Sequence, residues 1–402
     1  MPIDRRIFGL GLGSLGLGSL GLVASAAQAQ TARPWPYLIG ADVSWIPQDE
    51  AQGAVYFENG VQKDPLDILR GAGFNAIKLR LFVNPELGYS KTDPDRKWCG
   101  LDQTITFARR IKAKGFHLSL TFHLGDTWAD PEHQAKPAAW ANLAFPQLVD
   151  AVHDHVATSL AAMKAAGCAP DLVLIGNETT FGTLWPDGEI AMPVPTGNPV
   201  TDAHHATPPA EGGLDHFATL LKAGLAGVRE TLPQAKTAIH NHLGRHWGIV
   251  QYWTDNLMQR GVEVDAVGFS CYQQAHEGDW QTTFDNFSRR YPKTGFFMAE
   301  YSSRKRYCND LVHDHPNGWG AWIWEPTRHQ EAIFDKDGHN AGEGPRPNLL
   351  SQGLNAAEAP GGAAPNAPAQ PPKPRPPQSH GGRYDANGLL DVYRQMARDY
   401  AV

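Results

Sequence analysis

The chain contains few cysteines and no excess of basic residues. Four cysteines among 402 residues are too few for the disulfide framework that holds small secreted domains together. The 35 Lys and Arg residues are outnumbered by 42 Asp and Glu, which gives a formal net charge of −7. Such a chain lacks the positive charge that neutralises phosphates, so we expect no nucleic-acid partner. Hydrophobic residues make up 42%, which is ample for a core and excludes a wholly disordered chain.

Tryptophan and histidine are common by comparison, with 12 and 17 residues respectively. Flat aromatic faces and uncharged hydrogen-bonding rings suit a surface that binds sugars. The composition therefore favours a carbohydrate as one candidate partner.

Residues 1–29 have the pattern of an export signal. Arg5-Arg6 precede a Gly/Leu-rich run over 9–23, and Ala27-Gln28-Ala29 offers small residues where a signal peptidase cuts. Glycines and serines interrupt the run, which is short for a span of roughly 20 residues, so we predict a cleaved signal and not a membrane anchor. The arginine pair resembles a twin-arginine signal, with Asp4 in place of the usual serine or threonine. We expect an exported, periplasmic or secreted, monomeric protein without membrane contact after cleavage.

A twin-arginine route would export a folded protein, so the chain would fold in a reducing compartment. We therefore expect few or none of its thiols to form disulfides. The four residues concerned are Cys99, Cys168, Cys271 and Cys308.

Short apolar runs bounded by turn residues predict eight strands. They lie at 38–44, 76–82, 117–123, 172–177, 237–241, 266–270, 296–301 and 321–324. Segments with apolar residues at helical spacing separate several of them, including 101–114, 143–166 and 214–230. This alternation is typical of parallel βα units. Eight such units over roughly 300 residues favour an α/β fold of the (β/α)8, or TIM, barrel type, a single catalytic domain over residues 30–340.

Two stretches interrupt the alternation. Residues 341–382 contain ten prolines and seven glycines among 42 residues, and proline removes backbone donors, so we predict a flexible insertion. Residues 187–213 are rich in Pro, Thr, His and Gly and are predicted to form a long ordered loop. Within 383–402 apolar residues return at helical spacing, and Asn387 is a candidate N-cap. This last segment is predicted to be a helix that packs back on the barrel.

The carboxyl ends of the predicted strands, where a barrel of this kind carries its chemistry, are polar and aromatic. The residues there are Asp42, Arg80, His123, Asn177, Glu178, His240, Tyr272, Glu300 and Trp324. Glu178 and Glu300 follow the fourth and seventh strands, so we expect them to face each other across the mouth. Two carboxyl groups roughly 5–5.5 Å apart can hydrolyse a glycosidic bond with retention, one as the acid and the other as the nucleophile.

Two neighbours have expected roles in that reaction. Arg80 would keep the nucleophile ionised, because a nearby cation lowers the pKa of a carboxyl group. Asn177 would bond the sugar 2-hydroxyl more strongly in the transition state than in the ground state.

Longer motifs around these residues resemble glycoside hydrolase family 53, the arabinogalactan endo-β-1,4-galactanases. The motifs lie at 40–44, 79–85, 123–131, 136–140, 175–178, 184–188, 220–228 and 324–326. The resemblance extends over residues 38–335 and implies a (β/α)8 barrel that cleaves internal β-1,4-galactosidic bonds of pectic galactan. It implies Glu178 as general acid/base and Glu300 as nucleophile. The further substrate-binding residues that it implies are Asp126, Trp128, Trp185 and Trp324.

Three segments depart from the family pattern. The sixth-strand loop, 271–278, lacks two aromatic residues of the family, and Asn241-His242 stands where the family has Leu-Asp. After the second glutamate, Arg304, Lys305 and Arg306 add three positive charges. An acidic glycan is therefore an alternative substrate, although a charge run is more often a solvated surface loop.

A metal-dependent hydrolase is a second alternative. His240 and His242 share one face of a strand, and His123, Asp126 and His246 are candidate further ligands. A barrel that binds a glycan without cleaving it is the third class, which the presence of both glutamates disfavours.

For the glycosidase we expect no cofactor and no metal. A calcium site occurs in some members of the family that the chain resembles. The segment between Glu300 and Trp324 offers no carboxylate-rich loop for such an ion.

Overall fold

The computed structural model describes residues 35–207, 212–272, 279–329, 331–342 and 380–402. The predicted export signal, 1–29, lies outside the described residues, as do most of the predicted insertion, 341–382, and most of the altered loop, 271–278. In the described ranges, no helix combines the length and the apolar character needed to cross a membrane.

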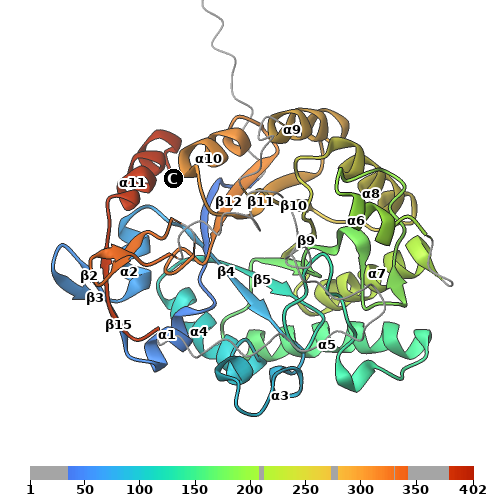
Figure 1. Ribbon diagram of the computed structural model, residues 1–402, viewed down its shortest axis with the longest axis horizontal. Coiled ribbons are helices and arrows are strands. Elements are labelled where there is room, and N and C mark those ends of the chain that lie inside the picture. Colours follow the sequence, from blue (N-terminus) through green and yellow to red (C-terminus); the bar gives the residue numbers. More distant parts are fainter. Residues whose placement is uncertain (1–34, 208–211, 273–278, 330, 343–379) are drawn as a thin grey trace, which may run out of the picture. The chain divides into compact units, whose positions relative to one another are not determined.

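Eight parallel strands close into a barrel (Figure 1). In chain order they are β1 (Leu38–Asp42), β4 (Ala76–Leu81), β5 (His117–Phe122), β6 (Leu172–Ile175), β9 (Lys236–Asn241), β10 (Ala266–Ser270), β11 (Gly295–Tyr301) and β12 (Gly318–Trp324). β12 pairs with β1 and closes the ring, with Leu38 opposite Gly320. Every residue of β1, β4, β6, β10 and β11 is buried, as expected for parallel strands covered on both faces. The predicted TIM barrel is confirmed.

Helices pack around the barrel (Figure 1). The longer ones are α2 (Pro65–Gly71), α4 (Leu101–Ala113), α5 (Phe145–Ala165), α7 (Gly213–Thr231), α8 (Trp247–Gln259), α9 (Asp279–Arg290), α10 (Lys305–His313) and α11 (Leu389–Tyr400). Short helices are α1 (Ile46–Ala51), α3 (Pro85–Gly88) and α6 (Pro199–His204). The helices predicted at 101–114, 143–166 and 214–230 correspond to α4, α5 and α7, with ends that differ by less than one turn.

The C-terminal helix α11 completes the ring of helices beside α10 (Figure 1). The ring of Tyr393 lies 4.3 Å from that of Phe74, just after α2, and its hydroxyl lies 2.9 Å from that of Tyr301 on β11. Asn387 Oδ1 accepts a hydrogen bond from the Leu389 N–H at 3.0 Å, which fits its predicted capping role. The last segment therefore packs back on the barrel after the Pro/Gly-rich stretch.

A five-stranded sheet beside the barrel was not predicted. Its strands, in spatial order, are β14 (His339–Asn340), β13 (Phe334–Lys336), β15 (Gly382–Ala386), β2 (Ala54–Glu58) and β3 (Val61–Lys63). The segment 383–402, expected to be helical throughout, thus begins as a strand. The two hairpins turn at Asn59-Gly60 and Asp337-Gly338, all four residues with positive φ. Asn-Gly and Asp-Gly are strong hairpin signals, so these turns were visible in the sequence.

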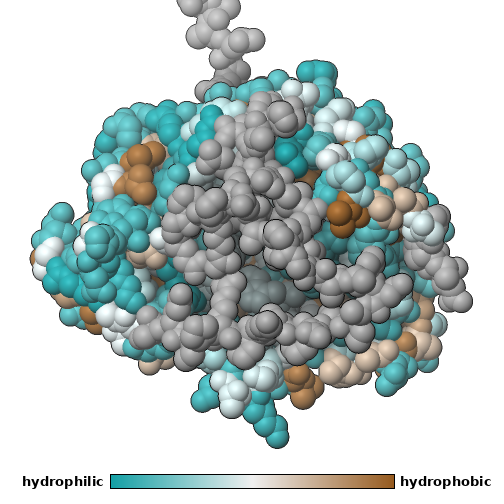
Figure 2. Space-filling model, viewed as in Figure 1, coloured by the Kyte–Doolittle hydropathy of each residue, from teal (hydrophilic) through white to brown (hydrophobic). Residues whose placement is uncertain are grey.

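All four cysteines are buried and unpaired, as predicted. The loop predicted over 187–213 is ordered in its described part, where it carries β8 (Gly188–Glu189), which pairs with β7 (Gly182–Thr183), and α6. On the face drawn in Figure 2, the coloured surface is mainly hydrophilic, with scattered apolar residues.

Candidate active site

Glu300 lies near the end of β11 and is 7% exposed. The Tyr272 hydroxyl donates a hydrogen bond to its Oε2 at 2.6 Å, and Lys78 Nζ lies 3.3 Å from its Oε1. Lys78 also donates to the Ala299 carbonyl oxygen at 2.8 Å and lies 3.4 Å from Asp42 Oδ2. Burial and the nearby charge of Glu300 raise the pKa of Tyr272 well above its ordinary value, so the phenol stays a donor. The negative charge of Glu300 is thus both hydrogen-bonded and paired.

Glu178 follows β6 in a left-handed conformation, with φ of +50°. Its Oε1 makes a short hydrogen bond with the Ser270 hydroxyl. Ser270 ends β10 and is the register partner of Glu300 on β11. The barrel therefore brings two glutamates that are far apart in the sequence to neighbouring positions on its rim. A left-handed non-glycine residue costs about 1 kcal/mol or more, so the surrounding contacts must hold this turn.

The two carboxyl groups have different surroundings. Burial, and then the charge of Glu300, raise the pKa of Glu178 well above its ordinary value. Glu300 by contrast contacts the Lys78 ammonium directly. Environments that differ in this way suit one protonated acid and one ionised carboxylate.

A chain of hydrogen bonds runs behind Glu178. Asn177 Nδ2 donates to the Ala129 carbonyl at 2.9 Å, which directs its amide oxygen toward His240 Nδ1 at 3.2 Å. His240 is fully buried, and its Nε2 lies 2.9 Å from Ser270 Oγ. Burial lowers the pKa of His240 well below its ordinary value, so the ring is neutral and carries one N–H.

These partners assign the proton positions along the chain. The Asn177 oxygen can only accept, so His240 carries its proton on Nδ1, and its Nε2 accepts from the Ser270 hydroxyl. Ser270 then offers only lone pairs to Glu178. The contact between Ser270 Oγ and Glu178 Oε1 is satisfied in this tautomer when Glu178 is protonated, which favours the raised pKa that burial produces, whereas a Ser270 hydroxyl that donated to Glu178 would lower that pKa.

Arg80 pairs with a different carboxylate from the one expected. Its Nη1 lies 2.6 Å from Glu325 Oε1 and 3.5 Å from Asp42 Oδ1. The expectation that Arg80 holds Glu300 ionised is wrong, because Lys78 is the cation in contact with Glu300. Both cations lie on β4, two residues apart and on the same face, so sequence alone could not say which reaches the glutamate. Glu325, whose pKa burial raises to about 8, was also missed.

Three half-buried tryptophans, Trp45, Trp128 and Trp324, form an aromatic cluster at the rim. Their ring centroids lie 6.0 Å (Trp45 to Trp128), 5.2 Å (Trp45 to Trp324) and 6.0 Å (Trp128 to Trp324) apart. The Arg80 guanidinium lies 4.1 Å above Trp128, and that of Arg328 lies 3.8 Å above Trp45. Trp45 thus stands with Trp128 and Trp324, the two tryptophans that the sequence resemblance implied as substrate-binding residues.

Asp126 and His123 are engaged by the backbone of the loops. Asp126 accepts hydrogen bonds from the N–H groups of Asn84 at 3.0 Å and Ala138 at 2.8 Å. His123 Nδ1 accepts from the Ala129 N–H at 3.1 Å. Both side chains therefore position the loops after β4 and β5, whatever they offer to a substrate.

The metal-dependent alternative has no support in this geometry. His240 contacts Asn177 and Ser270, and His242 Nδ1 lies 2.7 Å from Thr180 Oγ1. Within the described ranges, Glu132, His204 and His205 form a group whose ligand atoms lie within 4.8 Å of one another. The ligands expected from the sequence form no such group; they are His123, Asp126, His240, His242 and His246.

The basic run after Glu300 is largely paired within the protein. Lys305 is buried and lies 3.2 Å from Glu331, and Arg306 lies 2.8 Å from Asp310 and pairs with Asp399. These pairs remove the main observation that favoured an acidic glycan.

Trp185 lies apart from the tryptophan cluster. Its ring stands edge-on to His204 and His205, with centroids 6.1 and 5.6 Å away. Its backbone N–H donates to the Gln134 carbonyl at 2.7 Å. The structure therefore places this expected substrate-binding residue against the end of α6 and not in the tryptophan cluster.

Comparisons with known proteins identify the family. Residues 38–333 match the family described as Glycosyl hydrolase family 53. An arabinogalactan endo-β-1,4-galactanase of Humicola insolens is 32% identical over 247 residues, 58% of this chain and 63% of that protein. A probable arabinogalactan endo-β-1,4-galactanase A of Aspergillus terreus is 31% identical over 326 residues, 72% of this chain and 85% of that protein. An uncharacterized protein of Niallia circulans is 31% identical over 329 residues, 72% of this chain and 84% of that protein.

The fold is similar to solved structures as well. The catalytic domain of a family 53 protein of Ignisphaera aggregans superimposes with a TM-score of 0.64 at 27% identity, over 89% of this chain and 95% of that chain. A fungal β-1,4-galactanase gives 0.61 at 25% identity, over 74% and 90%. With a TIM barrel and two glutamates at its rim, the chain belongs to glycoside hydrolase family 53.

Proposed function

We propose that the protein is a retaining endo-β-1,4-galactanase that cleaves internal bonds of galactan, the type of side chain found on pectin. The observation that carries the proposal is the placement of Glu178 and Glu300 on either side of Ser270, in contrasting environments. The names of the galactanases at 31–32% identity support the substrate.

In the first step, Glu178 gives its proton to the glycosidic oxygen while Glu300 attacks the anomeric carbon. The bond from that carbon to the leaving sugar breaks, and a glycosyl–Glu300 ester forms. In the second step, Glu178, now ionised, takes a proton from water, and the water oxygen displaces Glu300. Lys78 and Tyr272 stabilise the carboxylate of Glu300 before attack and after its release.

The other rim residues have proposed binding roles. The tryptophan cluster offers aromatic faces on which sugar rings stack. Asn177 is the neighbour of the proposed acid and His240 lies behind it, so both act on the reaction through Glu178. We also propose that the protein is exported, on the strength of the N-terminal sequence pattern.

A panel of purified polysaccharides tests the proposal. Wild type, Glu300→Ala, Glu178→Gln and the exposed control Glu263→Gln are incubated with galactan, arabinan, xylan and polygalacturonate, and the products are sized by chromatography. We expect short galacto-oligosaccharides from wild type and the control, and activity at least about 10³-fold lower in the two site variants. Proton NMR of the first products should show retained β-anomers.

Intact galactan beside a second, cleaved polysaccharide would overturn the substrate. Inverted products would overturn double displacement, because a nucleophilic glutamate gives retention.

A further inference from the structure

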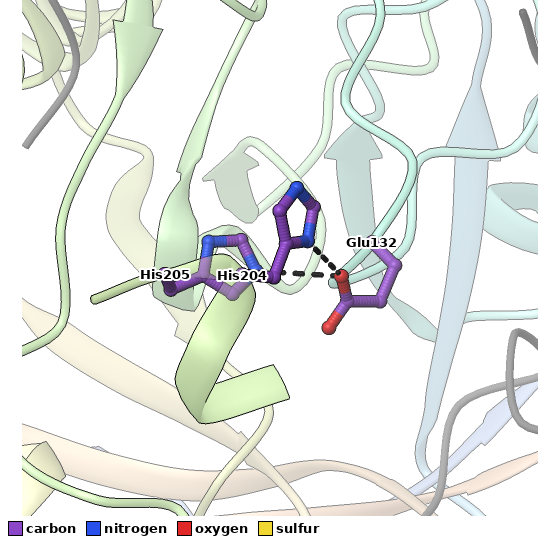
Figure 3. Close-up of side chains that lie close together, drawn as sticks. All are labelled: Glu132, His204 and His205. Atoms are coloured by element: carbon purple, nitrogen blue, oxygen red, sulfur yellow. Dashed lines mark hydrogen bonds and ion pairs between the residues drawn. The ribbon is translucent and has the colours of Figure 1, made fainter. Parts of the chain in front are cut away.

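Glu132, His204 and His205 form a second polar cluster, separate from the candidate active site (Figure 3). Glu132 comes from the loop after β5, and the two histidines end α6 and follow it. The Glu132 Oε2 atom lies 3.1 Å from His204 Nδ1 and 3.3 Å from His205 Nε2. One donor atom from each residue lies within 4.8 Å of the others. Two loops that follow different strands thus converge on one point.

The donor set and its spacing match a tetrahedral metal centre. Two imidazoles and one carboxylate are ligands that zinc uses, with bonds of about 2.0–2.2 Å. In a tetrahedron with bonds of that length, neighbouring ligand atoms lie roughly 3.3–3.5 Å apart. The two separations from Glu132 Oε2, 3.1 and 3.3 Å, are close to that value. The third separation, between the donor atoms of the two histidines, is at most 4.8 Å.

Burial leaves one side of this cluster open. The side chains of His205 and Glu132 are 1% and 10% exposed, whereas that of His204 is 51% exposed. A cation can therefore enter past His204, and water can occupy the fourth position. A divalent ion would also neutralise a carboxylate that is nine-tenths buried.

The surrounding packing holds the ligands in place. Phe181 stacks on the His205 ring, with centroids 3.8 Å apart and planes 9° from parallel. The His205 carbonyl accepts a hydrogen bond from the Met192 N–H at 2.8 Å. The Glu132 N–H donates to Asp130 Oδ1 at 2.9 Å. Neither buried ligand would need to move far to bind an ion.

We propose that Glu132, His204 and His205 bind one divalent transition-metal ion of the zinc type, which ties the 187–207 loop to the loop after β5. The sequence pattern predicted no metal at this place, because Glu132 and His204 lie 72 residues apart along the chain. The ion is structural. It holds the position of Trp185, which both histidines contact edge-on.

Zinc titration of chelator-treated full-length protein tests the site. Wild type is compared with Glu132→Gln, His204→Ala and the control His133→Ala. The His204 side chain is exposed, so it can be removed without disturbing the core. His133 is an exposed histidine adjacent to Glu132. Calorimetry should show one zinc ion per wild-type chain, and an affinity lower by about tenfold or more in the first two variants. His133→Ala should bind as wild type does.

Two further measurements are independent of glycan cleavage. Zinc should raise the Tm of wild type and of His133→Ala, but not that of Glu132→Gln or His204→Ala. Cobalt added in place of zinc should give the intense visible absorption of a four-coordinate ion. Equal zinc affinity in all four proteins, or no stoichiometric binding to wild type, would overturn the proposed metal site. Either result would mean that Glu132, His204 and His205 form a hydrogen-bonded cluster without a metal ion. Neither result would bear on the galactanase proposal, which the polysaccharide panel tests separately.

Discussion

Ser270 connects Glu178 to His240. Its substitution therefore tests how the hydrogen-bond network affects the pKa of Glu178, apart from the effect of burial. In Ser270→Ala the protonated Glu178 loses its acceptor, and the pKa of the carboxyl group should fall. The general acid must be protonated, so we expect the alkaline limb of kcat/KM to move to lower pH by roughly one unit, with kcat reduced about tenfold. The pH profile measures this directly, with Ser288→Ala as a remote control. A limb that moves upward would mean that Ser270 donates to an ionised Glu178.

Lys78 is the second residue on which the proposed chemistry depends. Lys78→Met leaves the buried carboxylates of Glu300 and Asp42 without their shared cation. Removing one partner of a buried pair costs about 3–5 kcal/mol, so we expect that loss of unfolding free energy in urea and a kcat lower by about 10²-fold or more.

Lys112→Met provides the matched control for that variant. Lys112 pairs with Asp171 at 2.8 Å in a partly exposed position. An exposed pair of this kind contributes about 1 kcal/mol or less, so stability should change little and kcat should stay at the wild-type value. Full activity in Lys78→Met would remove the cation from the mechanism.

Helix α11 connects the end of the chain to the active-site strand. Tyr393 is fully buried, and its hydroxyl meets that of Tyr301, the residue after Glu300. Truncation of a buried aromatic side chain costs about 3–5 kcal/mol, so Tyr393→Ala should lower the unfolding free energy by that amount. Tyr393→Phe should cost only about 1 kcal/mol, because the Tyr301 hydroxyl loses one hydrogen bond and keeps the one from the Asn309 amide. Urea unfolding compares the two with the exposed-face control Arg398→Ala, and wild-type stability in Tyr393→Ala would mean that α11 is dispensable.

The dependence of stability on pH is a property of the whole molecule. Burial raises the pKa of Glu325 to about 8, that of Asp49 to about 7 and that of Glu178 well above its ordinary value. The folded protein keeps these protons at a pH where the unfolded chain has released them. Stability is therefore lost as the pH rises toward the folded pKa values. Burial of His155 and His242 lowers their pKa to about 4 and about 3, which has the opposite sign but acts only below about pH 6.5.

We therefore expect the unfolding free energy to change little between pH 5 and 6.5 and to fall between pH 6.5 and 8.5. Urea unfolding at a series of pH values measures this. Asp49→Asn should reduce the fall, because neither oxygen of this fully buried carboxylate has a hydrogen-bond partner among the described residues. The exposed control Asp391→Asn should leave the curve unchanged. A stability that rises toward pH 8.5 would contradict the raised pKa values.

Much of the barrel could be predicted because its signals are local. Each strand is a short apolar run between turn residues, and the strand ends carried Glu178 and Glu300 with their motifs. The Asn59-Gly60 and Asp337-Gly338 hairpins have equally local signals, because both dipeptides favour a two-residue hairpin turn. The parallel pairing of β15 with β2 was not predictable in this way, because the two strands lie near opposite ends of the chain.

By itself, the amino-acid sequence determined the order of strands and helices, the two glutamates at the strand ends and the four reduced cysteines, since these follow from hydrophobic pattern, position and composition. Only the tertiary structure decided that Lys78 and not Arg80 meets Glu300, that Trp45 joins Trp128 and Trp324, and that Glu132 meets two histidines. The physical reason is that contacts depend on how far each side chain reaches in the folded protein. Which side chains touch depends on the length of each side chain and on how the barrel brings distant loops together, and neither is encoded in the spacing of residues along the chain.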